Sequence, residues 1–270
     1  MEISGLELLP HHADSIGNIV RAFEADQSSL AILLGGSIAH GYARPDSDID
    51  VMVVVDATEY RRRADEGRLV FVDRSACTYE GGYVDGKYVD MGFLERVAAH
   101  GSDPARFAFQ DARILVSRIE GLPQALAAIA RYPAGEAADR MTRFTAQLLA
   151  WRWYFGESAR QQDPYLEVVA LHKVVLFACR LVLAANERLY PYHKWLLRET
   201  ARAGRRPPGL MEDIERVLAE RTVPLVEELC GDVLAFYGID EAQANASWGG
   251  RFLEDTELAW ASGHPAIDDL

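Results

Sequence analysis

The first half of the chain alternates between apolar positions at helical spacing and short apolar runs. Residues 12–24 have apolar side chains along one helical face, and an apolar run at residues 30–34 ends at a pair of glycines. This order predicts a helix, a strand and a glycine turn. Residues 48–55 begin with two aspartates and are otherwise apolar on both faces, which is typical of the central strand of a sheet.

Two further stretches extend the predicted sheet. Residues 69–73 have the composition of a strand, and residues 82–93 resemble a hairpin that turns at Asp85-Gly86. An Asp-Gly pair favours such a turn because both residues tolerate positive φ. The pattern therefore places Asp90 on the second arm of the hairpin and Asp85 in the turn itself.

The chain after Pro133 has helical spacing almost throughout. Prolines stand near the starts of the helical segments, as is usual where helices begin. These segments are predicted at residues 137–157, 164–189, 192–203, 209–221 and 223–237. We therefore expect an α/β (α+β) domain with a mixed sheet over residues 1–120, followed by an all-α helical bundle over residues 121–270.

The net charge narrows the partners that the chain is expected to bind. The chain has 28 Lys and Arg residues against 41 Asp and Glu residues, which gives a formal net charge of −13. A field of this sign repels the phosphate backbone of a nucleic acid, whereas a nucleotide that arrives with Mg²⁺ is still compatible with it. Nucleic acid is therefore not expected as a partner.

The N-terminal sequence and the cysteines predict a cytoplasmic protein. Residues 1–15 have no basic stretch leading into an apolar one, so no secretion signal is predicted. The three cysteines are odd in number and far apart, which favours reduced core thiols. The most apolar stretch, residues 165–185, contains Glu167, His172, Lys173 and Arg180, so a buried helix is favoured over a membrane span.

The clearest chemical signal is the pair of aspartates that opens the predicted central strand. Asp48 and Asp50 are two residues apart, so both side chains point to one face, with Cα atoms about 6.5–7 Å apart. Two like charges there are destabilising unless a cation lies between them, and hard oxygen ligands favour Mg²⁺ or Mn²⁺. Asp90, in an otherwise apolar arm, is the best-placed third acid for a two-metal site.

A glycine turn precedes these acids. Gly35, Gly36 and Ser37 stand between a strand and a helical turn, where backbone N–H groups and a hydroxyl can bind phosphate. Such a turn alone is equally well explained as a tight connection, and an isolated Asp-x-Asp pair is more often a surface turn. Their combination, with ten residues between Ser37 and Asp48, is more specific than either part.

The two motifs together resemble a known family. Gly-Gly-Ser-x-Ala-x-Gly at residues 35–41 and Ser-Asp-Ile-Asp at residues 47–50 resemble the signature of the DNA polymerase β-like nucleotidyltransferases. The small members of that family, which modify antibiotics or proteins, are the most similar. The resemblance implies that a nucleotidyltransferase domain precedes the helical bundle, and that a nucleoside monophosphate is transferred with release of pyrophosphate.

The resemblance also implies roles for matching positions. Gly35, Gly36, Ser37 and Ser47 would bind the nucleotide, with Ser37 at the β- and γ-phosphates. Asp48, Asp50 and Asp90 would bind the metal ions and form the catalytic group, with Asp90 at the second metal or acting as the base.

The helical half offers further candidates. Lys173 is a candidate contact of the triphosphate, although a lysine on a half-buried helix can equally extend to solvent. Glu95 and Glu157 are alternative bases. Arg188 and His193 resemble the ribonuclease motif of HEPN-type helical domains, but a structural role is favoured for both.

The expected function is transfer of a nucleoside monophosphate, AMP from ATP or another NMP from its NTP, to a hydroxyl of a small molecule. The acidic chain suits a cationic acceptor such as an aminoglycoside, as in antibiotic resistance, and a lincosamide or a metabolite hydroxyl would also fit. Two alternatives stay open. One is a protein adenylyltransferase of the antitoxin type, and the other is a non-catalytic regulator that binds nucleotides.

Overall fold

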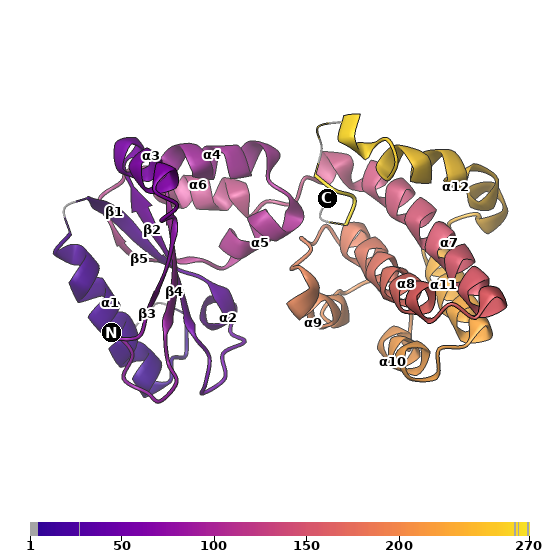
Figure 1. Ribbon diagram of the computed structural model, residues 1–270, viewed down its shortest axis with the longest axis horizontal. Coiled ribbons are helices and arrows are strands. Elements are labelled where there is room, and N and C mark those ends of the chain that lie inside the picture. The colour runs from indigo at the N-terminus through magenta and orange to yellow at the C-terminus, as the bar shows by residue number, and fades with distance from the viewer. Residues whose placement is uncertain (1–4, 27, 262, 264, 269) are drawn as a thin grey trace. The chain divides into compact units, whose positions relative to one another are not determined.

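The chain divides into two compact units, Met1–Arg131 and Tyr132–Leu270 (Figure 1). The computed structural model describes residues 5–26, 28–261, 263, 265–268 and 270. The last helix of the first unit, α6 (Leu122–Ile129), packs against α4 and α5 of the same unit. The boundary therefore lies after this helix, whereas the sequence pattern placed it at residue 120.

A five-stranded mixed sheet forms the centre of the first unit. Its strand order is β3-β4-β2-β1-β5, with β3 (Val70–Asp73) and β5 (Arg113–Ser117) at the edges. β1 (Ser29–Leu34) pairs antiparallel with β2 (Ile49–Val55), and β2 pairs parallel with β4 (Val84–Val89). The predicted α/β domain with a mixed sheet is thus confirmed.

Alternate residues of the two central strands point to two separate cores. On one face, Leu33, Met52 and Val54 pack with side chains of α4 (Met91–His100) and α6. On the other face, strand residues pack with side chains of α1 (Pro10–Glu24) and α2 (Gly36–Ala39). Figure 1 shows α1 and α4 on opposite sides of the sheet. Because both faces are covered, β1 and β2 are apolar almost throughout.

Residues 82–93 do not form the predicted hairpin. β4 runs through Asp85 and Gly86 as a regular strand, parallel to β2, and its antiparallel partner is β3. Gly86 is required because an added Cβ would lie 2.0 Å from the ring of Phe71 on β3. The Asp-Gly pair thus reflects close packing between two strands, and the turn that it suggested is absent from this stretch.

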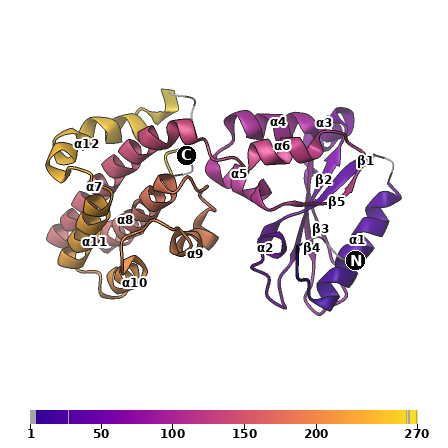
Figure 2. The same cartoon turned by 180° about the vertical axis from the view of Figure 1, so that it is seen from behind.

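The second unit is helical, which confirms the predicted bundle. α7 (Ala137–Gln161) and α8 (Pro164–Ala185) lie side by side at its centre (Figure 2). The remaining helices among the described residues are α3 (Ala57–Asp65) and α5 (Asp103–Gln110) in the first unit, and α9 (Leu196–Ala201), α10 (Leu210–Glu220), α11 (Val223–Phe236) and α12 (Glu241–Asp255) in the second. Short 3₁₀ turns occur at Ala134–Glu136, His193–Trp195 and Ala259–Ala261.

α8 is long and apolar enough to cross a membrane by length and composition alone, but most of it is buried inside the protein. In its most apolar window, 72% is buried. Arg180, in this helix, is 1% exposed, and its guanidinium lies 4.5 Å from the ring of Phe144 and 4.2 Å from that of Tyr190. The same group donates to the carbonyl oxygens of Asp268 and Leu270. α8 is therefore the core helix of its unit, as its ionisable residues predicted.

Candidate metal centre

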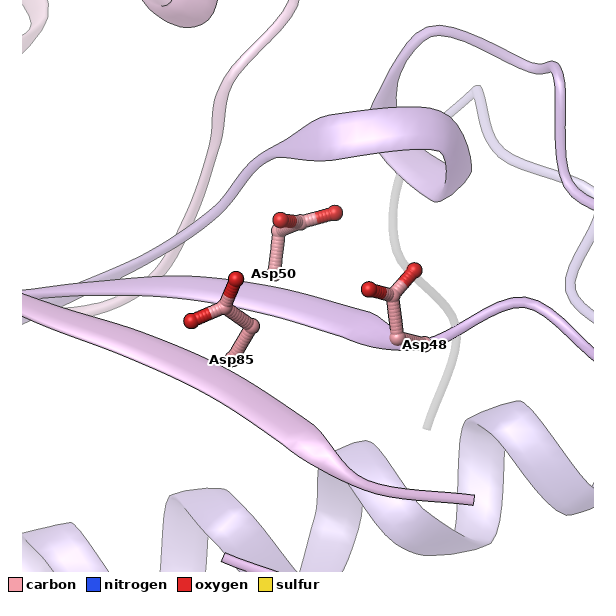
Figure 3. Close-up of side chains that lie close together, drawn as sticks. All are labelled: Asp48, Asp50 and Asp85. Carbon is pink, nitrogen blue, oxygen red and sulfur yellow. The ribbon is translucent and has the colours of Figure 1, made fainter. Parts of the chain in front are cut away.

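Three aspartates from two neighbouring strands meet at one end of the sheet (Figure 3). Asp48 directly precedes β2, Asp50 lies on β2, and Asp85 lies opposite Asp50 on β4. One carboxylate oxygen of each residue lies within 4.8 Å of the other two. Paired residues of adjacent strands point to the same face, as do residues two apart along a strand. The register of β2 and β4 therefore brings the three acids together.

The chemistry of this donor set fits a divalent cation. Asp48 and Asp50 are half-buried and Asp85 is exposed, so the group keeps one side open to solvent. Carboxylate oxygens suit Mg²⁺ or Mn²⁺, which retain water or phosphate oxygen in the remaining coordination positions. Three carboxylates so close together repel one another, and a bound cation would offset that repulsion.

The glycine turn closes over Asp50. The Gly35 N–H donates to the carbonyl of Asp50 at 2.9 Å, which ties the turn to β2. Gly36 has a φ of 60°, and a Cβ added there would lie 1.7 Å from the Asp50 Oδ2 atom. Position 36 thus requires glycine for two reasons: its φ is positive, and the Asp50 carboxylate occupies the space that a Cβ would need.

Ser37 follows directly in this turn. Its side chain is buried, at 6% exposed, and its hydroxyl has no hydrogen-bond partner among the described residues. Buried hydroxyl groups are usually hydrogen-bonded, so an orphaned one in the glycine turn suits the oxygen of a bound ligand. The phosphate-binding role that the sequence predicts for Ser37 stays a prediction.

Ser47 shapes the loop that leads into Asp48. Its hydroxyl accepts a hydrogen bond from the Arg44 N–H at 2.8 Å, and its carbonyl accepts one from the Tyr79 hydroxyl at 2.6 Å. The structure therefore gives Ser47 a place in holding the loop. Its predicted contact with the nucleotide stays a prediction.

Asp90 lies outside the acid group, contrary to the sequence expectation. It is the N-cap residue of α4, 8% exposed, and its carboxylate accepts a hydrogen bond from the Phe93 N–H at 2.6 Å. Side chains alternate along a strand, so a residue five positions after Asp85 does not share its face. The third acid beside Asp48 and Asp50 is Asp85.

Sequence reasoning also missed Lys87, which is two residues after Asp85 on the same face of β4. Desolvation lowers the pKa of Lys87, against the opposing effect of the charges of Asp50 and Asp85. An ammonium group beside the acids can pair with phosphate oxygens. The alternation of residues 84–89 along one strand would place Asp85 and Lys87 on the same face, but only the pairing of β4 with β2 brings them beside Asp50.

The candidates in the helical unit have partners of their own. The Lys173 ammonium pairs with Asp268 and lies 5.7 Å from the ring of Trp151, so its predicted contact with the triphosphate stays a prediction. Of the two alternative bases, Glu157 pairs with Arg160, and Glu95 is exposed on α4.

Arg188 and His193 both have structural partners. Arg188 forms an ion pair with the buried Glu199. A ring nitrogen of His193 lies 3.1 Å from the Tyr190 hydroxyl. Both contacts lie in the segment that follows α8, and the first joins this segment to α9, which agrees with the structural role favoured from the sequence.

Part of the first unit matches a known domain family. Residues 16–109 match the family model described as the nucleotidyltransferase domain, and this range contains β1 to β4, the glycine turn and the three aspartates. Among solved structures, the chain is similar to a nucleotidyltransferase-like protein from Exiguobacterium sibiricum. The two are 14% identical, 93% of this chain and 80% of that chain are covered, and the TM-score is 0.48. No functionally curated protein matches the chain.

Proposed function

We propose that the protein is a metal-dependent nucleotidyltransferase that moves AMP from ATP onto a hydroxyl group of a small molecule. The observation that supports this most directly is the group formed by Asp48, Asp50 and Asp85 beneath the glycine turn. A cation-binding group of acids next to an orphaned buried hydroxyl is a suitable place for a triphosphate.

Each residue of the site then has a distinct task. Asp48, Asp50 and Asp85 would hold Mg²⁺ or Mn²⁺, which when bound supplies positive charge to the triphosphate and to the reacting oxygens. Ser37 donates its hydroxyl to a phosphate oxygen, and the backbone at Gly36 lets the triphosphate approach Asp50. Lys87 contributes a second positive charge on the same face.

The reaction is an in-line displacement. The acceptor hydroxyl oxygen forms a bond to the α-phosphorus, the bond between that phosphorus and the bridging oxygen breaks, and pyrophosphate leaves with the electron pair. The hydroxyl proton passes to a carboxylate of the group. Asp85 is the candidate for this base because it is the exposed member and lies on the side open to solvent.

The acceptor that we favour is cationic. The formal net charge of −13 attracts cations and disfavours a polyanionic acceptor. An aminoglycoside combines positive charge with several hydroxyl groups, so the protein would act as an antibiotic-modifying enzyme, without a nucleic acid or membrane partner. We place it in the cytoplasm, where ATP is available. A lincosamide or a metabolite with a free hydroxyl is the next candidate.

The acceptor is identified by direct detection of its modified form. The protein is incubated with Mg²⁺, each labelled NTP in turn, and a panel of aminoglycosides, lincosamides and small metabolites. Mass spectrometry should then detect an acceptor that carries one added nucleoside monophosphate, with ATP as the preferred donor. The double variant Asp48→Asn/Asp50→Asn is the control, and a product level equal to that of the control for every pair would contradict the proposal.

Asp85→Asn is expected to lower kcat/KM about a hundredfold, because one of the three carboxylates is lost while Asp48 and Asp50 remain. Asp90→Asn is the matched control. It also removes one negative charge, but asparagine caps a helix about as well as aspartate, so activity should stay within about twofold of wild type. Steady-state kinetics of both variants decide between the two acids, and the reverse order of effects would restore Asp90 as the third ligand.

A further inference from the structure

Tyr79 reaches the peptide that precedes Asp48. It lies in the connection between β3 and β4, far from Asp48 in sequence, and its hydroxyl donates to the carbonyl of Ser47 at 2.6 Å. Burial raises the pKa of Tyr79 to about 12, with further contributions from Cys77 and from the charge of Asp48. The hydroxyl therefore stays protonated and can act only as a donor to this carbonyl near neutral pH.

The ring of Tyr79 is held on several sides. The rings of His11 and His12, at the start of α1, lie 4.7 Å and 5.2 Å from it between centroids. A Cβ added at Gly82 would lie 2.7 Å from the Tyr79 ring, so the backbone packs directly against it. His11 also reaches the same loop, with Nε2 at 3.0 Å from the carbonyl of Pro45.

A second tyrosine of the same connection also interacts with Asp48. The carbonyl of Tyr83 accepts a hydrogen bond from the Ile49 N–H at 3.0 Å, so the backbone is fixed directly after Asp48 as well as before it. The hydroxyl of Tyr83 interacts with the Asp48 carboxylate, and this interaction raises the pKa of Tyr83. Of the two tyrosines, Tyr79 acts only through the backbone.

We propose that Tyr79 is a positioning residue of the metal centre. Its hydrogen bond to Ser47 fixes the orientation of the peptide between Ser47 and Asp48, and thereby the direction in which the Asp48 carboxylate points. Without it, the loop from Arg44 to Ser47 would be held by its own hydrogen bonds and by His11 at Pro45, none of which fixes the Ser47 carbonyl, and Asp48 would sample orientations unsuited to a shared cation. The inference rests on the proposed function in one respect, that Asp48 binds a metal ion.

The test uses Tyr79→Phe, which removes only the hydroxyl, in the full-length protein. Mn²⁺ binding is titrated by the loss of its free electron paramagnetic resonance signal, and thermal unfolding is recorded in EDTA. The half-saturating Mn²⁺ concentration should rise about fivefold, the factor expected from the loss of one neutral hydrogen bond. Tyr60→Phe, on α3, is the matched control and should titrate as wild type does. Where transfer is measurable, saturating Mg²⁺ should restore kcat of Tyr79→Phe, as a merely structural defect would not allow.

The outcomes of this test distinguish the positioning role of Tyr79 from the proposed metal-dependent function. If Tyr79→Phe binds Mn²⁺ as tightly as wild type, while Asp48→Asn does not, the positioning role is wrong and the metal centre stands. If wild type and Asp48→Asn bind Mn²⁺ equally, Asp48 does not hold a metal ion, and the proposed function itself is contradicted. Gly82→Ala is a second, independent variant in case Tyr79→Phe does not fold. It displaces the Tyr79 ring but keeps the Tyr79 hydroxyl, and it should also raise the half-saturating Mn²⁺ concentration.

Discussion

Asp50→Asn is expected to lower kcat/KM for nucleotide transfer about a thousandfold while the fold remains intact. Asn has the size of Asp but lacks the charge, and a metal ion contributes several kcal/mol of transition-state charge stabilisation in such reactions. Asp50 is the central member of the group, paired with Asp85 in the strand register and covered by the glycine turn. Its loss should therefore weaken the hold on the cation more than the loss of the exposed Asp85.

Asp50→Asn should not lower the stability of the protein, although it lowers the activity. Removing one of three neighbouring carboxylates relieves repulsion, so the free energy of unfolding in EDTA should equal or exceed that of wild type. Steady-state kinetics and thermal unfolding of the same preparation measure both quantities. A rate within tenfold of wild type would contradict the catalytic role of Asp50. A large fall in melting temperature would show that Asp50 stabilises the fold.

Gly36→Ala is the second variant with a large expected effect, also about a thousandfold in kcat/KM. A Cβ at this position would lie 1.7 Å from Asp50 Oδ2, so either the carboxylate or the glycine turn must move. Displacement of Asp50 should cost about as much as removal of its charge, because catalysis depends on exact placement of the ligands.

Gly41→Ala is the control for backbone strain. Gly41 has a φ of 72°, close to the 60° of Gly36, but a Cβ there meets no described atom within 4 Å. Both variants place alanine in the left-handed region at a cost of roughly 1 kcal/mol, and only one of them disturbs Asp50. Kinetics and Mn²⁺ binding of the two proteins should therefore differ widely, and equal losses would trace the defect to strain in the turn.

The part of the site that could be predicted from sequence depends on local geometry. Asp48 and Asp50 share a face because of the two-residue period of a strand, whatever the rest of the fold does. Gly36 follows from the same kind of reasoning, since a strand that turns directly into a helix needs an unusual backbone conformation. The central, doubly buried strand was likewise evident from its apolar residues.

Asp85 could not be found in this way, because its place depends on pairing between distant strands. The Asp85-Gly86 pair has the local signature of a turn, and that signature outweighed the alternating pattern of residues 84–89. Position 86 requires glycine because the ring of Phe71, on another strand, packs against it. Patterns of neighbouring residues cannot reveal such a contact. The contact of Tyr79 with Ser47 was missed for the same reason.

The helical unit shows a related limit. Five helical segments were predicted from apolar spacing and prolines, but α12 was not singled out. Gly249 and Gly250 lie within this helix, and glycine disfavours helix on propensity alone. Its start is nevertheless defined locally, because the Asp240 side chain accepts a hydrogen bond from the Gln243 N–H at 3.0 Å. Packing of α12 against α7 offsets the weak propensity.

The most direct test of the central claim is pyrophosphate release in the presence of Mg²⁺, ATP and the acceptor panel, compared across wild type, Asp50→Asn, Asp85→Asn and Asp90→Asn. We predict release by wild type and by Asp90→Asn, a loss of about a hundredfold for Asp85→Asn and about a thousandfold for Asp50→Asn. Release by wild type that is no faster than by Asp50→Asn, with every acceptor and every NTP, would contradict the account.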